Sequence, residues 1–200
     1  MSPAPPLVRA IVARTLLRAL ADTNHEAMLR RELGPVRLDH IENASAVNWL
    51  PFPDLAALAV PALAALGDEH YADLWRGVNA RLMDSALLRP MVGSIRTVLG
   101  LTPLTVLKAV PRAWPLVFRE VCDVSLTARG PNDVELRLHN LRVDARAMEA
   151  LAKGMIGVCR SYLDLANVSG RVTLLPEQAA PAKGVLVLQV TWVASPRPTP

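Results

Sequence analysis

The chain has 200 residues, of which 52% are hydrophobic and 20% are charged, and its formal net charge is +4 at pH 7. This length fits one domain of ordinary size, and the hydrophobic fraction is too high for an intrinsically disordered chain. Acidic and basic residues alternate along most of the sequence, and no basic stretch is interleaved with aromatic residues. We therefore expect no nucleic acid partner.

Three features indicate the compartment. The longest apolar run, Leu55–Leu66, would be only about 18 Å long as a helix, well short of a bilayer core. Leu7–Leu20 is broken by three arginines, whereas a secretory signal has an uninterrupted apolar centre. Cys122 and Cys159 are too few for a disulfide scaffold and lie on apolar sides of their elements, so we expect buried free thiols. The sequence predicts a cytoplasmic protein that does not span a membrane.

The first half of the chain has helical periodicity. Glycine and proline mark the ends of its helices, because glycine permits a left-handed turn and proline lacks the N–H of the next bond. A short helix near His25–Leu33 should end at Gly34-Pro35, and residues 36–48 should be a loop with one helical turn. The other predicted helices are Leu7–Ala21, Leu55–Leu66 with a kink at Pro61, Glu69–Leu82, Met83–Leu99 with an interruption near Pro90, and a short helix from Pro103 that ends before Pro111.

The second half changes to the two-residue alternation of strands. Val121–Thr127 and Asp133–His139 alternate apolar and polar residues, and the Gly130-Pro131-Asn132-Asp133 cluster between them predicts a hairpin turn. A long helix follows, and then strands at Arg171–Leu175 and Val185–Val193, separated by a polar loop. The last strand is expected to be central, because neither of its faces is clearly polar.

This order of elements predicts a single α+β domain over residues 7–193. An N-terminal helical part, residues 7–118, should pack on a C-terminal part, residues 119–193. The C-terminal part forms a β-β-α-β-β unit with an antiparallel sheet of about four strands. We expect disorder in the lead 1–6 and in the tail 194–200.

The long helix, Asp144–Ala166, has three distinct faces on a wheel of about 100° per residue. A charged face should point to water, and a face of Met, Leu, Val, Cys and Tyr should pack on the sheet. Between them lies a small stripe, formed by Ala147, Ala150, Gly154, Gly157 and Ser161. Glycine inside a helix costs roughly 1 kcal/mol relative to alanine, so something is expected to approach this stripe closely. Either another helix of the chain or a second subunit would do so.

The sequence contains no catalytic or phosphate-binding motif of known spacing: Walker, GxGxxG, HExxH, CxxC and GxSxG patterns are all missing. No histidine stands at metal-ligand spacing from another histidine or a cysteine. No nucleophile, base and orienting residue can be assembled from the pattern. We therefore predict no catalytic residue, no metal site and no enzymatic activity.

Large apolar side chains are the remaining feature that could serve a binding function. They either fill the core or line a cavity for an apolar ligand beneath the helices, and the pattern leaves both open. The candidate lining residues of such a pocket are Trp75, Trp114, Met148, Met155 and Cys159.

Several segments carry a likeness to a known family. They are Gly100-Leu101-Thr102-Pro103, Val110-Pro111-Arg112-Ala113-Trp114, the stretch from Glu120 to Asn140 with its Gly130-Pro131 turn, the glycine-bearing helix and the terminal strand Val190-Thr191-Trp192. Through them the chain resembles an uncharacterised paralogous family abundant in myxobacteria, over most of Leu17–Val193. The layout is also similar to the wider group of haem-NO-binding, 4-vinyl-reductase and TRAPP-type domains.

The resemblance implies an α+β sensor or scaffold fold, often dimeric, with an apolar pocket between helices and sheet. Haem binders of this group carry a proximal His and a Tyr-x-Ser-x-Arg motif, which the closest fragment here, Cys159-Arg160-Ser161-Tyr162, does not match. The Cys-rich metal site of some 4-vinyl-reductase-type members is absent from the sequence too. We therefore expect no cofactor and, in particular, no haem. A small apolar molecule remains as the ligand that the resemblance allows.

The function that follows is a non-enzymatic ligand-binding or signalling module with an apolar pocket, acting through a protein partner. The alternative is a structural interaction protein that forms a homodimer through the small stripe. An enzyme with an unrecognised site is the third hypothesis.

Overall fold

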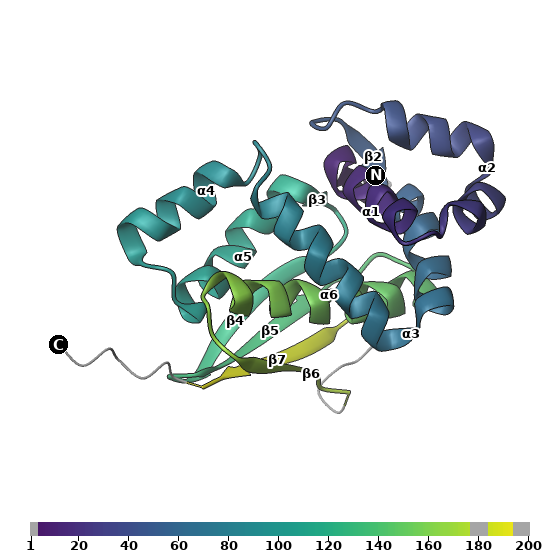
Figure 1. The fold of residues 1–200 in the computed structure, drawn as a ribbon. Helices are drawn as coiled ribbons and strands as arrows, with labels where there is room; N and C mark the ends of the chain where they lie inside the picture. The colour runs from purple at the N-terminus through teal and green to yellow at the C-terminus, as the bar shows by residue number, and fades with distance from the viewer. Residues whose placement is uncertain (1–3, 177–183, 194–200) are drawn as a thin grey trace.

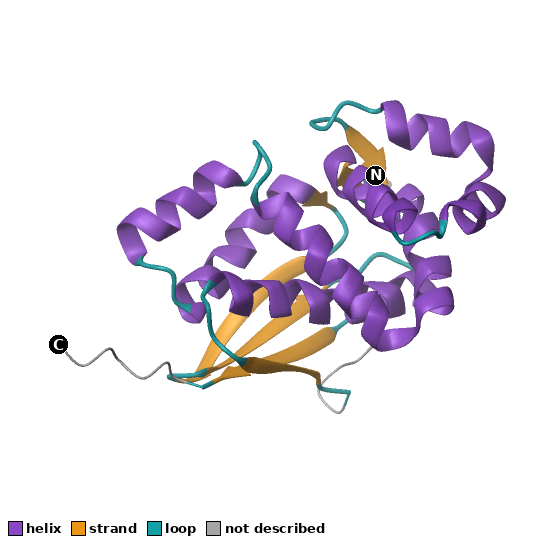
Figure 2. Cartoon of the chain, in the orientation of Figure 1, coloured by secondary structure: helices purple, strands orange, loops and turns teal. Residues whose placement is uncertain are grey.

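The computed structural model describes residues 4–176 and 184–193. The predicted tail 194–200, most of the predicted loop before the last strand and the first three residues of the predicted lead lie outside the described residues. A layer of helices covers one face of an antiparallel sheet, and the N-terminal helices form a lobe beside it (Figures 1 and 2). The elements are β1 (Leu7–Arg9), α1 (Ala10–Asp22), α2 (Glu26–Asn43), β2 (Trp49–Pro51), α3 (Phe52–Met83), α4 (Arg89–Ser94), the π-helical η1 (Ile95–Leu99), α5 (Pro103–Val117), β3 (Phe118–Arg119), β4 (Asp123–Gly130), β5 (Asp133–His139), α6 (Ala145–Leu165), β6 (Gly170–Leu174) and β7 (Leu186–Trp192).

The main sheet confirms the predicted α+β class and its antiparallel four-strand layout. Its strand order is β4-β5-β7-β6, so the last strand is internal, as predicted. Leu136 of β5 lies opposite Leu126 on one side and Leu188 on the other. These residues belong to the apolar face of the sheet, on which α6 lies (Figure 1). Within the described chain, no helix is both long enough and apolar enough to cross a bilayer.

A second, small sheet was not predicted from the sequence. It has the order β2-β1-β3, and Val8 of β1 pairs with both Leu50 and Phe118. The helix predicted from Leu7 therefore starts only at Ala10. Strands of two or three residues are too short to show an alternation, and partners this distant in the sequence cannot be inferred from local pattern.

Two helix ends also differ from prediction. Gly34 has φ 71°, but a new helical segment starts directly after it, so the predicted loop is largely helical. Proline is favoured in the first turn of a helix, because N–H groups there have no partner inside the helix and the N–H that proline lacks costs no hydrogen bond. The helix predicted to stop before Pro111 continues to Val117. Its buried side, which includes Leu107, Val110 and Trp114, packs into the core on both sides of that proline, and this packing outweighs one lost hydrogen bond.

The α6 helix starts where predicted, because the Asp144 side chain accepts a hydrogen bond from the Ala147 N–H at 2.9 Å. Its small stripe is buried and faces α3 of the same chain. A Cβ at Gly157 would lie 1.8 Å from the carbonyl oxygen of Ala72 on α3. The Asn79 amide on α3 donates to the Ser161 hydroxyl at 2.7 Å. The hypothesis that a second subunit packs on the small stripe is therefore corrected, since α3 fills that position.

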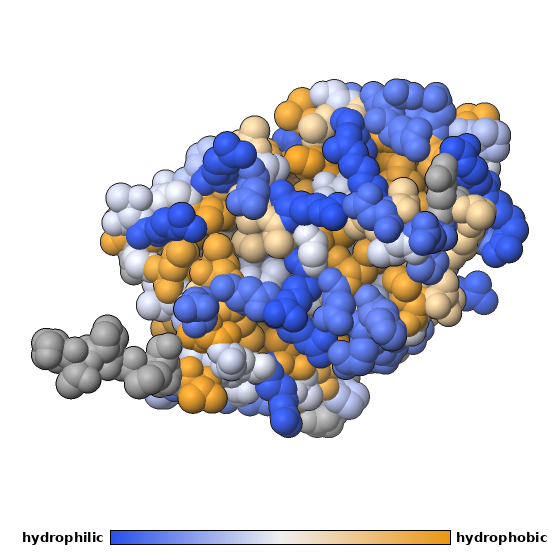
Figure 3. Space-filling view, viewed as in Figure 1, coloured by the Kyte–Doolittle hydropathy of each residue, from blue (hydrophilic) through white to orange (hydrophobic). Residues whose placement is uncertain are grey.

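Ion pairs flank this helix contact, so the charged face of α6 does not simply point to water. Arg76 on α3 holds Asp164 in a bidentate pair with both distances at 2.6 Å, and Arg160 pairs with Glu69 at 2.9 Å. Hydrophilic residues accordingly gather on the surface where α3 crosses α6 (Figure 3). Each exposed pair is worth at most about 1 kcal/mol, so the glycine contact carries more of the specificity.

The close approach of α3 and α6 predicts the effect of adding one methyl group at Gly157. Gly157→Ala should lower the free energy of unfolding by about 2–3 kcal/mol, because the Ala72 backbone cannot move aside as a side chain could. Gly77→Ala is the matched control, since nothing lies within 4 Å of its Cβ position. The control should raise stability by roughly 0.5–1 kcal/mol through helix propensity. Urea unfolding checks both, and equal effects of the two variants would contradict the tight contact.

The outer face of the sheet is polar and contains a buried carboxylate, Glu135, with 5% exposure. Arg129 donates to it through Nε at 3.2 Å, and Arg137 donates through Nη2 at 2.9 Å. The Arg129 hydrogen bond, aided by Arg137, lowers the pKa of Glu135 below its ordinary value although burial opposes this. A carboxylate whose pKa is lowered by folding contributes stability at pH values above its ordinary pKa. This contribution is lost as the pH falls through the pKa of the folded state.

This cluster predicts a pH-dependent component of stability below about pH 4.5. Glu135→Gln should cost about 1–2 kcal/mol at pH 7, because both arginines lose a charged partner. This deficit should shrink as the pH falls below about 4.5, the ordinary value, and should be lost once the pH has passed the lowered pKa of Glu135 in the folded protein. Thermal unfolding across that range checks this. Glu149→Gln, an exposed position on α6, is the control and should show little change at any pH.

Candidate functional site

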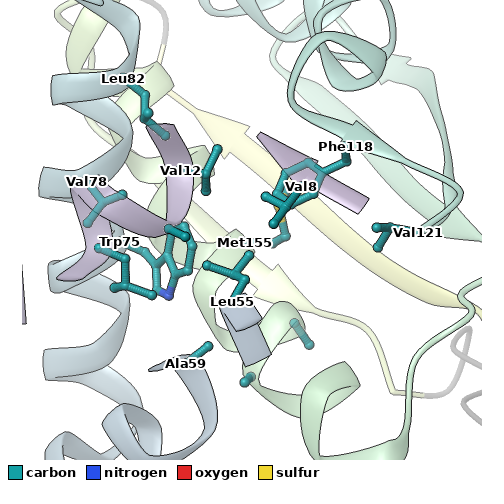
Figure 4. Packing of buried hydrophobic residues seen from close by; sticks show 14 of the residues in the cluster. Val8, Val12, Leu55, Ala59, Trp75, Val78, Leu82, Phe118, Val121 and Met155 are labelled. Carbon is teal, nitrogen blue, oxygen red and sulfur yellow. The ribbon is translucent and has the colours of Figure 1, made fainter. Parts of the chain in front are cut away.

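An apolar cavity of about 70 Å³ lies between the helices of the two parts of the chain. Helices α1, α3, α5 and α6 all contribute to it, so residues far apart in sequence meet there. Trp75 of α3 and Met155 of α6 lie near each other, with Leu55 close by (Figure 4). Other apolar lining residues are Val12, Ala59, Val110, Leu151 and Val158.

Three of the five sequence-predicted pocket residues line the cavity: Trp75, Trp114 and Met155. The other two do not. Met148 is 8% exposed and Cys159 is fully buried, but both belong to the core outside this lining. On the α6 wheel both lie on the far side of Met155 from the small stripe. The cavity lies instead at the boundary between the stripe and the apolar face.

The polar residues of the lining, which were not predicted as pocket residues from the sequence, are Tyr71, Asn79 and Tyr162. Tyr71 recurs with Trp75 at helical spacing, which indicated only a buried helix face. Asn79 is 7% exposed and is fixed by its bond to Ser161. Asn79 stands four residues after Trp75 and three before Leu82, on the apolar face of the predicted helix. An amide at such a position was the signal in the sequence that could have indicated a polar element in this pocket.

Several polar atoms around the cavity are left without partners. Among the described residues, the Tyr71 hydroxyl and the indole nitrogens of Trp75 and Trp114 are buried and make no hydrogen bond of good geometry. Tyr71 and Trp75 are in an edge-to-face arrangement with ring centroids 6.4 Å apart. The Trp114 ring stacks on Phe118 at 4.3 Å, and its N–H lies toward the Cys122 thiol, whose pKa it lowers slightly against the larger effect of burial.

The cavity is electrically neutral. Among its lining residues in the described chain there is no Asp, Glu, Lys, Arg or His. Burial raises the pKa of Tyr71, with Trp75 opposing the shift, and burial raises the pKa of Tyr162, with Asn79 opposing it. Both phenols therefore keep their protons near neutral pH. In residues 4–176 and 184–193, no three His, Cys, Asp or Glu side chains are grouped closely enough to hold a metal ion.

The comparisons with known proteins give matches of structure only. No protein-family model matches the chain, and no curated protein matches it. The Fe(II) unliganded H-NOX protein from K. algicida is similar with a TM-score of 0.68 and 11% identity, covering 96% of this chain and 100% of that one. A Cs H-NOX mutant with an unnatural amino acid has a TM-score of 0.63 at 7% identity, covering 94% and 98%. An oxygen-binding H-NOX domain related to soluble guanylate cyclases has a TM-score of 0.61 at 8% identity, covering 92% and 94%.

The chain therefore has the H-NOX α+β fold, and the predicted relation to the haem-NO-binding fold group is confirmed at the level of the fold. Identities of 7–11% carry no residue roles from these proteins to this chain. The likeness to the myxobacterial family stays a prediction.

The expectation of no cofactor, and of no haem in particular, is contradicted by these comparisons. One similar structure is described as "Probing the function of heme distortion in the H-NOX family", and another as an Fe(II) unliganded H-NOX protein. Haem is thus the cofactor to which this fold points. The expectation rested on the missing Tyr-x-Ser-x-Arg motif, a local pattern that does not show which fold the chain adopts.

The residues of this pocket, in their present positions, do not fit a haem. A cavity of about 70 Å³ is small beside the roughly 300–1,000 Å³ typical of larger ligand pockets. Haem iron is usually held by His, Cys, Met or Tyr; the lining offers Met155, Tyr71 and Tyr162, and both tyrosines have raised pKa values. A haem-bound state would therefore require a repacked pocket.

The two thiols are predicted to be unreactive in the folded protein. Burial raises the pKa of Cys159 to about 12, and burial with the adjacent Asp123 raises that of Cys122 to about 12. At pH 8 only about one such thiol in ten thousand is ionised. A chromogenic disulfide reagent should react slowly with native protein and rapidly with both thiols in guanidinium. Fast reaction of one thiol in native protein would contradict this burial.

Proposed function

We propose that this chain is a non-enzymatic, cytoplasmic ligand-binding module, and that its ligand occupies the apolar cavity between α3, α5 and α6. The observation that carries the proposal is the cavity itself, because it lies at the junction of α1, α3, α5 and α6 and is bordered by unsatisfied polar atoms. The shared fold adds support, since one protein with this fold is described as an oxygen-binding domain.

The chemistry of the lining favours binding over catalysis. Its polar side chains are two phenols, one amide and two indoles, and both phenols have raised pKa values. General acid–base catalysis works best with a group that titrates near the operating pH. The cavity is therefore better suited to holding a molecule than to transforming one.

Signalling requires that the ligand change the relative energies of two arrangements of the protein. The lining comes from both sides of Gly67, with Leu55 and Ala59 before it and Trp75 and Asn79 after it. A ligand that separates these side chains would alter how the two segments of α3 pack. We propose that a protein partner responds to this change.

The proposal is tested by filling the cavity. Ala59→Leu places a larger side chain at a lining position that is 6% exposed. Ala65→Leu, an exposed position on the same helix, is the matched control. Ligand retained by the purified protein is measured by native mass spectrometry, and haem binding is measured by titration with haemin and the visible absorption band of bound haem.

Ala59→Leu should lose bound ligand while keeping or raising its melting temperature, because it fills space without a polar cost. The control should bind as the wild type does. If haemin binds stoichiometrically to the wild type and the control but not to Ala59→Leu, the ligand of the cavity is haem. If the wild type retains nothing and neither haemin nor a small apolar compound binds, the proposal is wrong.

A further inference from the structure

The unpaired donors of the cavity indicate what kind of ligand it takes. Tyr71 is fully buried and Trp75 is 8% exposed, yet within the described part of the chain neither the hydroxyl of the first nor the indole N–H of the second makes a hydrogen bond of good geometry. Buried polar groups in folded proteins are nearly always hydrogen-bonded. Two unsatisfied groups together, in one cavity, are therefore an unusual arrangement that a ligand would relieve.

The two donors come from neighbouring side chains on one face of α3. They are four residues apart on α3, so both side chains leave the same side of the helix. Their rings meet edge to face, at an interplanar angle of 71°. An indole nitrogen can only donate, and a protonated phenol has one hydrogen to donate. Even if the indole donates to the phenol oxygen, the phenol hydrogen still needs an acceptor.

Gly154 on α6 keeps this part of the cavity open. A Cβ at this position would lie 3.0 Å from both Nε1 and Cδ1 of Trp75. An alanine there would press on the donating edge of the indole. Gly157 faces the backbone of α3, whereas Gly154 faces the indole of Trp75 and lines the cavity.

We propose that the ligand is an uncharged molecule with a small apolar body and one acceptor oxygen, which accepts hydrogen bonds from Tyr71 and Trp75. This inference rests on the proposed function and specifies its ligand. A carboxylate would leave water without meeting any cationic side chain in the described lining, and burying an unpaired charge is costly. A ketone, ester or ether oxygen satisfies the donors without that cost.

The test uses three probes of similar size. They are 2-butanone, 2-methyl-1-butene, which replaces the oxygen by CH₂, and butyrate, a carboxylate with one more heavy atom, which adds a charge. Each is titrated into ¹⁵N-labelled protein, and the indole N–H signal of Trp75, assigned from its absence in Trp75→Phe, is followed. The ketone should bind about five- to tenfold more tightly than the alkene and shift this signal downfield.

Tyr71→Phe removes only the oxygen and should abolish most of this preference while leaving affinity for the alkene unchanged. Tyr162→Phe is the matched control, because it deletes the hydroxyl of the other lining phenol, which lies toward Asn79. The control should retain the preference for the ketone.

The failures are distinguishable. If ketone and alkene bind equally and Tyr71→Phe changes nothing, the acceptor inference is overturned while the proposed function stands. Tighter binding of butyrate than of the ketone overturns the uncharged class alone. If none of the three probes binds, both the inference and the proposed cavity function are contradicted.

Discussion

The contact between α3 and α6 is the constraint on which the rest of this structure depends. The Gly157 backbone lies so close to the Ala72 carbonyl that no side chain fits between them. Trp75 of α3 and Met155 of α6 both line the cavity, so this contact fixes the spacing of two of its walls. The flanking ion pairs orient the two helices, but exposed pairs of this kind contribute little. Packing at a glycine therefore determines the geometry of the candidate site.

The fold of this chain and the lining of its cavity point to different ligands. The H-NOX structures that match this chain include proteins whose titles name heme or Fe(II). This chain fills the space between its helices with Trp75, Trp114, Phe118 and Leu151, which leave a cavity of about 70 Å³. The same backbone frame can thus be lined by bulky aromatic residues, and the identity of the ligand then depends on those residues.

The sequence predicted the elements whose signals are local. Asp144 caps α6, and the alternation in β5 and the apolar run in β7 identified the main sheet with its central strand. The small sheet was missed because Val8 pairs with residues more than 40 positions away, a relation that no local pattern shows. The pocket was predicted only in part. Trp75 and Met155 stood out by size, whereas Tyr71 belongs to the site only because α6 approaches α3. Met148 lies on nearly the same side of α6 as Met155 but about two turns nearer the start of the helix, outside the lining.

Gly67 divides α3 into two segments with different attachments. Its φ of 71° breaks the helix, and no atom lies within 4 Å of the position a Cβ would take. Among the described residues, the ion pairs between α3 and α6 involve Asp68, Glu69, Asp73 and Arg76, all of which follow this glycine. The first segment lies instead beside the N-terminal lobe (Figure 1). The two segments are consequently attached to different parts of the molecule, since Asp54 of the first segment pairs with Arg37 of α2 at 3.0 Å. Both segments line the cavity, so the cavity lies where the chain passes from one attachment to the other.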